Sequence, residues 1–204
     1  WFILLVYIVV FYKTYIAKFI DIWKYYFVFL LFQMCFVFFR IQEYFKYIIE
    51  VILKKSVTFT GRTEIWDLSF LLIKRSPIFG YGVYEGNGLI FWHNGYYYSH
   101  NGILEVMLQG GIVALLFFVV LFLIAAFPLY NYRRHYISGI VSTGIFSMLI
   151  IMLAEAQINS IWLFVLLVIA TCIKQIIIQV ESEKRKEYNY NGRNSETFYY
   201  YSRL

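Results

Sequence analysis

The sequence predicts an all-α integral membrane protein with about five transmembrane helices and one large extracytoplasmic loop that contains short helices. Hydrophobic residues make up 61% of the 204 residues and charged residues 15%, against about 45–50% and about 25% in soluble domains. Several apolar runs approach the about 20 residues that a helix needs to cross the hydrocarbon core. One long stretch, from Thr58 to Gly111, could not lie in a bilayer. These three observations predict the fold class.

The apolar runs divide the chain into four segments. Residues 1–39 contain two predicted transmembrane helices, residues 40–102 the extracytoplasmic loop, residues 103–180 three more transmembrane helices, and residues 181–204 a disordered cytoplasmic tail. The chain begins at Trp1, inside an apolar run, so it is expected to be the C-terminal part of a longer protein. After the first span, the expected spans are Trp23–Phe39, Ile103–Tyr130 (stopped by Pro128), Ile137–Ala154 and Ile161–Ile178.

The basic residues of the short loops predict the orientation. In the five-span arrangement they all fall on one side, and the connection at 155–160 on the other side has none. Lys and Arg are enriched in cytoplasmic loops, so this basic side and the C-terminus are expected in the cytoplasm, and the large loop outside. The net charge of +6 therefore reports orientation, and no nucleic-acid partner is expected. The residues concerned are Lys13, Lys18, Lys24, Arg133, Arg134, Lys184, Arg185 and Lys186.

The two cysteines, Cys35 and Cys172, fall inside predicted spans. They have no CxxC or metal-ligand spacing and are expected to be apolar packing residues. No Cys/His ligand set and no dinucleotide fingerprint is present, so no metal and no cofactor are expected.

Two helices are predicted inside the loop. Residues 41–52 have apolar positions at helical spacing, which suits a helix lying in the membrane interface. A second helix is expected from Arg62, with Thr60 as its N-cap, to about Arg75, where Ser76-Pro77 ends it. Glycines around Tyr81 then indicate tight, irregular backbone.

Arg62 is a candidate anion-binding residue. Backbone N–H groups are free at a helix start, and a guanidinium beside them makes a site for a phosphate or diphosphate. The alternative is a solvated surface arginine that tolerates a small dipole penalty. The local sequence favours neither interpretation.

His100-Asn101 precedes the third span and is a candidate for base chemistry. A histidine with its ordinary pKa near 6.5 can deprotonate a hydroxyl, and Asn101 would orient it or hold substrate. The alternative, favoured by the local sequence, is that Asn101 caps the following helix and His100 faces water. His93-Asn94 repeats the dipeptide but is followed by a loop, so it is expected to be uninvolved.

Two acids lie close to membrane depth, Glu105 in the third span and Glu155 at the end of the fourth. Acids within the membrane are functional candidates, whereas acids at the wet end of a helix are ordinary. For Glu155 the two interpretations are equal. Among the many aromatic residues, Tyr81 and Tyr84 are candidates for stacking on a sugar ring.

Four motifs occur in order after the second predicted span: Gly61-Arg62-x-x-x-Trp66, Pro77-x-x-Gly80-Tyr81-Gly82, His100-Asn101-x-x-Leu104-Glu105 and Gly110-Gly111-Ile112. Each motif is weak alone, but their order and spacing together are fairly specific. The ordered set resembles the O-antigen ligase/polymerase superfamily over about residues 58–125, with weaker agreement through Glu155.

The resemblance implies a metal-independent glycosyltransferase of the bacterial cytoplasmic (inner) membrane. Its donor would be an undecaprenyl-diphosphate-linked oligosaccharide and its acceptor a hydroxyl on the outer side. Arg62 would contact the donor diphosphate, and His100 would activate the acceptor. A second cation is open between Arg40, Arg75 and a residue outside this sequence. The remaining expected substrate-binding residues are Asn101, Trp66, Tyr81, Glu105, Arg75 and Glu155.

The function expected from this resemblance is a polymerase of repeat units in capsule or O-antigen biosynthesis. The alternatives are a ligase that transfers finished polysaccharide to a lipid or protein acceptor, and a polysaccharide transporter or flippase. Expected partners are membrane lipid, a chain-length regulator and a flippase. The site assignment predicts that Arg62 and His100 lie within a substrate's width of each other, with His93 elsewhere.

Overall fold

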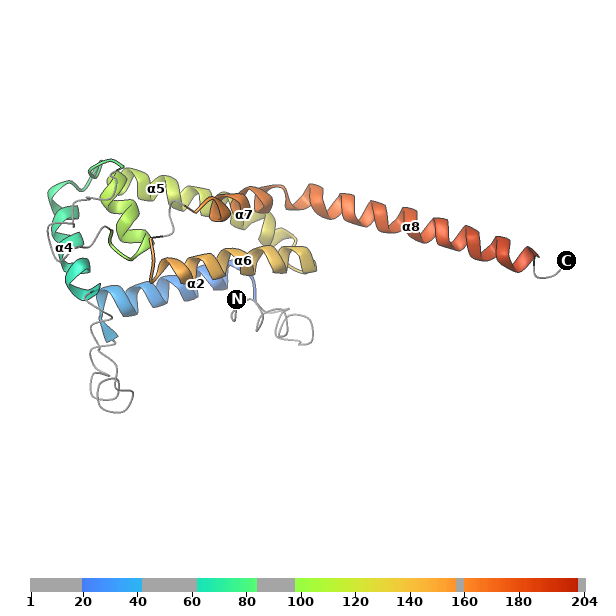
Figure 1. Cartoon of the computed structure of the whole chain (residues 1–204), viewed down its shortest axis with the longest axis horizontal. Coiled ribbons are helices and arrows are strands. Elements are labelled where there is room, and N and C mark those ends of the chain that lie inside the picture. Colours follow the sequence, from blue (N-terminus) through green and yellow to red (C-terminus); the bar gives the residue numbers. More distant parts are fainter. Residues whose placement is uncertain (1–19, 42–61, 84–97, 157–159, 202–204) are drawn as a thin grey trace.

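All elements in the described part of the chain are helices (Figure 1), so the all-α prediction is confirmed there. The computed structural model describes residues 20–41, 62–83, 98–156 and 160–201. Several predictions fall outside these residues: those for the first span, Thr60, most of the interfacial helix at 41–52, Tyr84 and His93. The elements are α2 (Ile22–Gln33), the π-helical turn η2 (Met34–Phe38), α4 (Arg62–Arg75), α5 (Gly102–Asn131), α6 (Tyr136–Met152), α7 (Ile161–Thr171) and α8 (Ile173–Tyr201).

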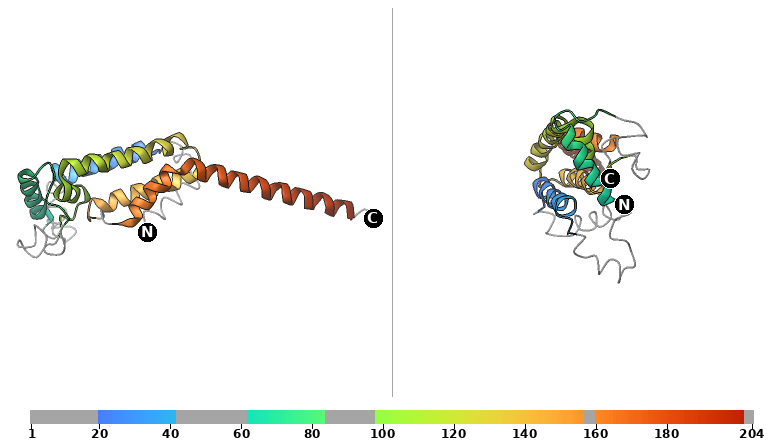
Figure 2. Two further views of the ribbon diagram at one scale, coloured as in Figure 1. Left: turned by 90° about the horizontal axis from the view of Figure 1, so that it is seen from above. Right: turned by 90° about the vertical axis from the view of Figure 1, so that its left-hand side faces the viewer.

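Four helices, α2, α5, α6 and α7, form a bundle with one apolar core. α2 packs on α6, α5 packs on α7, and α6 also contacts α5 and α7. α8 continues from α7 and extends beyond the bundle on the side away from α4 (Figure 2). The core is built from buried side chains of every helix of the bundle and the first turns of α8, among them Phe29, Phe122, Ile145, Leu163 and Ile173.

The outer surface of α5 is as apolar as its inner surface. Phe117 and Phe127 expose 69% and 60% of their area, on a helix whose packed side contributes Phe118 and Phe122 to the core. A helix that is apolar all round suits a membrane span. α5 is the one described helix that is long and apolar enough by itself to cross a membrane.

The number of spans stays a prediction. α7 and the first part of α8 together reach membrane-spanning length only as a pair bent by 68°. The apolar helices at Ile22–Phe38 and Tyr136–Met152 are shorter than a full span. Their positions nevertheless match the helices that the sequence predicts at 23–39 and 137–154.

Three details of the helices differ from expectation. Pro128 does not stop α5, which continues to Asn131, although a proline inside a helix removes the N–H donor to the carbonyl four residues earlier. The predicted span at 161–178 is interrupted at Cys172, between α7 and α8. Residues 181–201, expected to be disordered, continue α8 as a helix, because Glu, Lys and Arg at 181–187 are good helix formers.

α4 confirms the predicted helix from Arg62 to Arg75 and lies across the end of the bundle where α5 begins (Figure 1). Its buried face makes two small apolar clusters with neighbouring helices. Ile65 and Leu72 pack on Leu108 of α5, and Trp66 packs between Val37 and Leu104.

The turn after α4 is fixed to a break in α5. Gly111 has φ 61° and ψ −157°, which interrupts the helical path. Backbone groups of residues 77–82 hydrogen-bond to α5 on both sides of this break. The Tyr81 hydroxyl donates to the Leu72 carbonyl at 2.8 Å, so the turn is also tied back to α4.

Candidate functional site

Four polar side chains from three parts of the chain meet at the α4 end of the bundle. The Glu155 carboxylate lies at the centre. Its Oε1 is 3.4 Å from Nη2 of Arg62, and its Oε2 is 3.4 Å from Nδ1 of His100. The Tyr98 hydroxyl donates to the same Oε2 at 3.2 Å. These residues, Arg62, Tyr98, His100 and Glu155, are called the Glu155 cluster below.

Three residues of the Glu155 cluster lie at or just beyond the end of a helix. Arg62 is the first residue of α4, and His100 lies two residues before α5. Glu155 follows the last turn of α6, where its N–H donates to the Ile151 carbonyl at 2.9 Å. Helix ends carry backbone groups without helical partners, so the cluster combines side-chain charge with polar backbone.

The backbone at His100 is in the left-handed region, with φ 51°. This conformation is uncommon for a residue other than glycine and needs support from its surroundings. The support comes from Ser99, whose N–H and hydroxyl donate to Glu105 Oε2 at 3.0 and 2.8 Å. The indole N–H of Trp66 donates to the Ser99 carbonyl at 3.1 Å. The segment before α5 is therefore held from both α4 and α5.

Asn101 fixes where α5 begins. Its side-chain oxygen accepts from the N–H groups of Ile103 and Leu104, both at 3.1 Å, as the N-cap. Its amide also pairs with Gln33 of α2 and donates to the Leu153 carbonyl at 3.3 Å. Asn101 is fully buried. The alternative capping role that the sequence left open is thus the one that the structure gives it.

The structure brings together three of the predicted site residues, Arg62, His100 and Glu155. The other five have different surroundings. Asn101, Glu105 and Trp66 are buried, with polar atoms bonded inside the fold. The hydroxyl of Tyr81 bonds to the α4 backbone. Arg75 is exposed in the last turn of α4, and Arg40, the other candidate cation, pairs with Asp67.

Tyr98 is the member of the cluster that sequence reasoning missed. Its ring centroid lies 4.2 Å from that of His100, with the planes tilted by 47°. Burial, and then the neighbouring Glu155 carboxylate, raise the pKa of the Tyr98 phenol above its ordinary value. The phenol is therefore a hydrogen-bond donor at neutral pH. In the sequence it is the last of three consecutive tyrosines, and no local signal distinguishes it.

The cluster is partly exposed, which bears on its role. The side chains of Arg62, His100 and Glu155 retain 23%, 21% and 38% of their accessible area. Ion pairs exposed to this degree contribute only about 0–1 kcal/mol to stability. A guanidinium, an imidazole and a carboxylate in mutual contact, and accessible, can bind an anion and move a proton.

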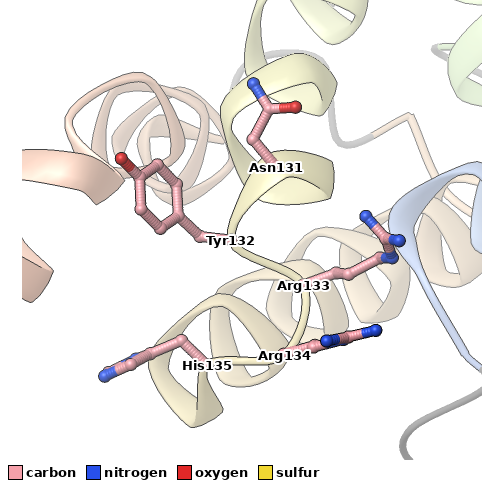
Figure 3. Close-up of a pocket in the computed structure, with 5 residues that line it drawn as sticks. All are labelled: Asn131, Tyr132, Arg133, Arg134 and His135. Atoms are coloured by element: carbon pink, nitrogen blue, oxygen red, sulfur yellow. The ribbon is translucent and has the colours of Figure 1, made fainter.

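Two cavities among the described residues lie elsewhere. One, of about 420 Å³, is formed by the α5–α6 turn at residues 131–135. Figure 3 shows that Arg133 and Arg134 extend to one side of this turn, while Tyr132 and His135 extend to the other. The second cavity, of about 320 Å³, is an apolar groove between α2 and α5. Neither is lined by the Glu155 cluster.

Comparison with known proteins gives one match. A family model described as O-antigen ligase matches residues 1–119. The matched range contains Arg62, Tyr98 and His100 but ends before Glu155. No curated protein and no solved structure matches this chain.

Proposed function

The chain belongs to the O-antigen ligase family, and from this premise we propose that it polymerises undecaprenyl-diphosphate-linked oligosaccharide repeat units of a surface polysaccharide. Family membership makes it a membrane protein of surface polysaccharide assembly, related to glycosyltransferases that act on lipid-linked saccharides. Our proposal adds four points to this: the polymerase activity, the undecaprenyl carrier, the independence from metal, and the roles of the residues named below.

The observation that carries the proposal is the contact of Arg62 and His100 with one carboxylate, Glu155. Glycosyl transfer from a lipid diphosphate needs two groups. The leaving diphosphate gains negative charge as the bond from sugar C1 to phosphate oxygen breaks, and a guanidinium stabilises it. The acceptor hydroxyl forms the new bond to C1 and loses its proton to a base, a step that contributes about 10²–10⁴-fold in rate.

In this proposal Arg62 holds the diphosphate at the start of α4, where backbone N–H groups add to the attraction. His100 takes the proton of the acceptor hydroxyl. Tyr98, beside the imidazole, offers an aromatic ring to a sugar. Arg75, exposed at the far end of α4, stays the candidate for a second cation, since Arg40 is paired with Asp67.

We place the cluster on the outer side of the cytoplasmic membrane, with the C-terminus inside. The support is the distribution of basic residues. The Arg133-Arg134 turn lies at the opposite end of α5 from His100. Lys184 reaches the same end as that turn, because its Nζ lies 5.2 Å from the ring of Tyr136. Basic residues mark the cytoplasmic end.

The ligase alternative is kept because the matching family is described by that activity. A transporter is disfavoured by the break in α5. Transporters use broken helices to present free backbone groups to substrate or ions. At Gly111 the groups on both sides of the break are bonded to residues 77–82 instead.

The test uses the complete gene in a strain that lacks its own copy. Arg62→Ala and His100→Ala are compared with His93→Ala, the repeated dipeptide, and polysaccharide length is read on a gel at matched membrane levels. We expect single repeat units for the first two variants and long chains for the third. Wild-type chains in all three would reject the site. Polymer that forms but stays on its lipid carrier would favour the ligase.

A further inference from the structure

We infer that Glu155 is a positioning residue for His100: it holds the Nδ1–H of the imidazole, so that Nε2 is the atom that accepts the proton. The inference rests on the proposed function for the identity of the reaction. It assigns to Glu155 a task different from the substrate binding that the sequence predicts. The two nitrogens of a neutral imidazole are distinct, and the partner of one decides which carries the proton.

The surroundings of Nδ1 carry the inference. This buried atom lies 3.4 Å from Glu155 Oε2, a charge contact whose geometry is not yet that of a hydrogen bond, whereas the side chain as a whole retains 21% of its accessible area. The exposed area therefore belongs to the other atoms of the ring. An ionised carboxylate only accepts hydrogen bonds, so the nitrogen that faces it is the one with the hydrogen. Catalytic hydrogen bonds are often long or poorly aligned without substrate and tighten in the substrate complex, and the inference requires this of the His100–Glu155 contact.

Tyr98 restricts both partners at once. Its hydroxyl donates to Oε2, the oxygen that faces His100, and its ring packs at 4.2 Å against the imidazole. Rotation of the carboxylate would break the hydrogen bond from Tyr98, and tilting the imidazole out of its plane would break the ring contact. Tyr98 thus restricts the carboxylate and the plane of the imidazole.

The backbone brings the two residues together through Asn101. The Asn101 amide donates to the Leu153 carbonyl at 3.3 Å, which ties the residue after His100 to the turn that carries Glu155. This hydrogen bond is partly buried and independent of the charged side chains. The pairing of His100 with Glu155 therefore follows from the packing of α5 against the end of α6.

The other charged groups nearby are assigned to other contacts. Arg62 from α4 lies on the opposite oxygen of the Glu155 carboxylate, Oε1. Glu105 from α5 accepts from Ser99 and Gln109. Because Arg62 and His100 use different oxygens, a diphosphate can draw Arg62 away without breaking the contact of Glu155 with His100.

His135 provides an internal comparison at the other end of the bundle. Its Nδ1 accepts the backbone N–H of Ile137 at 3.3 Å, and its Nε2 lies 3.8 Å from Glu181. The neutral ring of His135 must therefore carry its hydrogen on Nε2. The two histidines are expected to be opposite tautomers in the same molecule.

The first measurement is ¹⁵N NMR of the imidazoles in the full-length protein in detergent micelles, with His100 assigned by His100→Gln. We expect Nδ1–H for His100 and Nε2–H for His135. Glu155→Ala should shift His100 toward Nε2–H, Glu155→Asp should keep Nδ1–H, and Glu181→Gln, the matched control, should leave His100 unchanged. Nε2–H for His100 in the wild type, or no change in Glu155→Ala, overturns the inference.

The second measurement is the rate of chain growth on lipid-linked repeat units extracted from a strain that lacks the gene. Glu155→Gln should lower kcat by about 10–100-fold, with KM little changed, by analogy with the carboxylates that orient metal-bound imidazoles. Glu155→Asp should recover part of this loss. If His100→Ala abolishes growth but Glu155→Gln keeps the wild-type kcat, the inference alone fails. If His100→Ala still extends chains, the base role proposed for His100 fails; if the wild type extends none, the proposed polymerase activity fails, and the tautomer result is unaffected in both cases.

Discussion

The carbonyl group of Ile78 lies against Gly111 so closely that no side chain fits between them. A Cβ atom added to Gly111 would clash with the Ile78 carbonyl. The same Cβ atom would lie only 2.7 Å from the Phe79 backbone nitrogen. The break in α5 deprives residues 112 and 113 of helical acceptors. Their N–H groups donate instead to the carbonyls of Pro77 and Ile78, at 2.8 and 3.3 Å.

The turn after α4 also donates hydrogen bonds to α5. The N–H groups of Tyr81 and Gly82 donate to the carbonyls of Leu108 and Gln109, both at 2.8 Å. A Cβ on Gly80 would meet the Leu108 carbonyl at 2.5 Å. Two of the sequence motifs, at 77–82 and 110–112, thus form one backbone contact that connects the end of α4 to α5.

Gly111→Ala should disrupt this backbone contact. The new methyl group clashes with backbone atoms, which cannot rotate away, and alanine disfavours the positive φ of this residue. We expect the free energy of unfolding to fall by about 2–4 kcal/mol. Gly82 is the matched control, because its φ is also positive, at 82°, but open space surrounds it. Gly82→Ala should cost only about 1–2 kcal/mol. Unfolding of the purified protein in mixed micelles measures both. Equal losses would show that the close approach contributes nothing.

Asn101→Ala should destabilise the protein by about 2–4 kcal/mol. About 1 kcal/mol comes from the lost N-cap, and the rest from the buried Gln33 amide left without its partner. Gln33→Leu in the same protein removes that orphaned group, so the double variant should be less destabilised than the sum of the two single variants. A double-mutant cycle from the same unfolding assay measures the coupling. Strict additivity would contradict the pairing of these two amides.

Ser99→Ala should cost about 2–3 kcal/mol, because the buried Glu105 carboxylate loses the hydroxyl donor and keeps fewer partners. The variant should also impair polymer formation, since Ser99 supports the strained backbone of His100. Ser182→Ala is the control: its hydroxyl donates to a carbonyl on the exposed surface of α8, and its loss should be within about 0.5 kcal/mol. Unfolding and chain length are read in parallel, and a fully active, stable Ser99→Ala would refute this role.

The Tyr98 hydroxyl should stabilise the fold in a pH-dependent way. Burial, with Glu155 as a further cause, raises the pKa of Tyr98 in the folded protein. Its contribution is therefore complete below the unfolded pKa of about 10 and is lost as the pH rises through the higher folded pKa. The difference in unfolding free energy between wild type and Tyr98→Phe should be constant from about pH 7 to 9 and shrink above about pH 10. A difference that grows with pH would contradict the assignment.

The sequence predicts the parts of this fold that local pattern determines. Apolar runs indicate the bundle helices. Arg62 at the start and Ser76-Pro77 at the end correctly predict the bounds of α4. It cannot predict that Glu155 meets Arg62 and His100, because this contact depends on how α4 and α6 pack at one end of the bundle. Tyr98 is missed for the same reason. Asn101, Trp66 and Glu105 lie in the same motifs as Arg62 and His100, yet they are buried and support the fold.

Exchange of the charges of Arg62 and Glu155 separates structural from functional roles for this pair. Both single variants, Arg62→Glu and Glu155→Arg, place like charges about 3.4 Å apart and should lower stability by up to about 1 kcal/mol. The double variant restores opposite charges and should recover stability. It should not recover polymer formation, because the cation has moved from the start of α4 to the contact with His100. Asp67→Asn, which leaves Arg40 without its surface partner, is the control and should polymerise normally. Chain length on a gel, at matched membrane levels, decides the question: long chains from the double variant would show that the pair is a structural tie and that the diphosphate binds elsewhere.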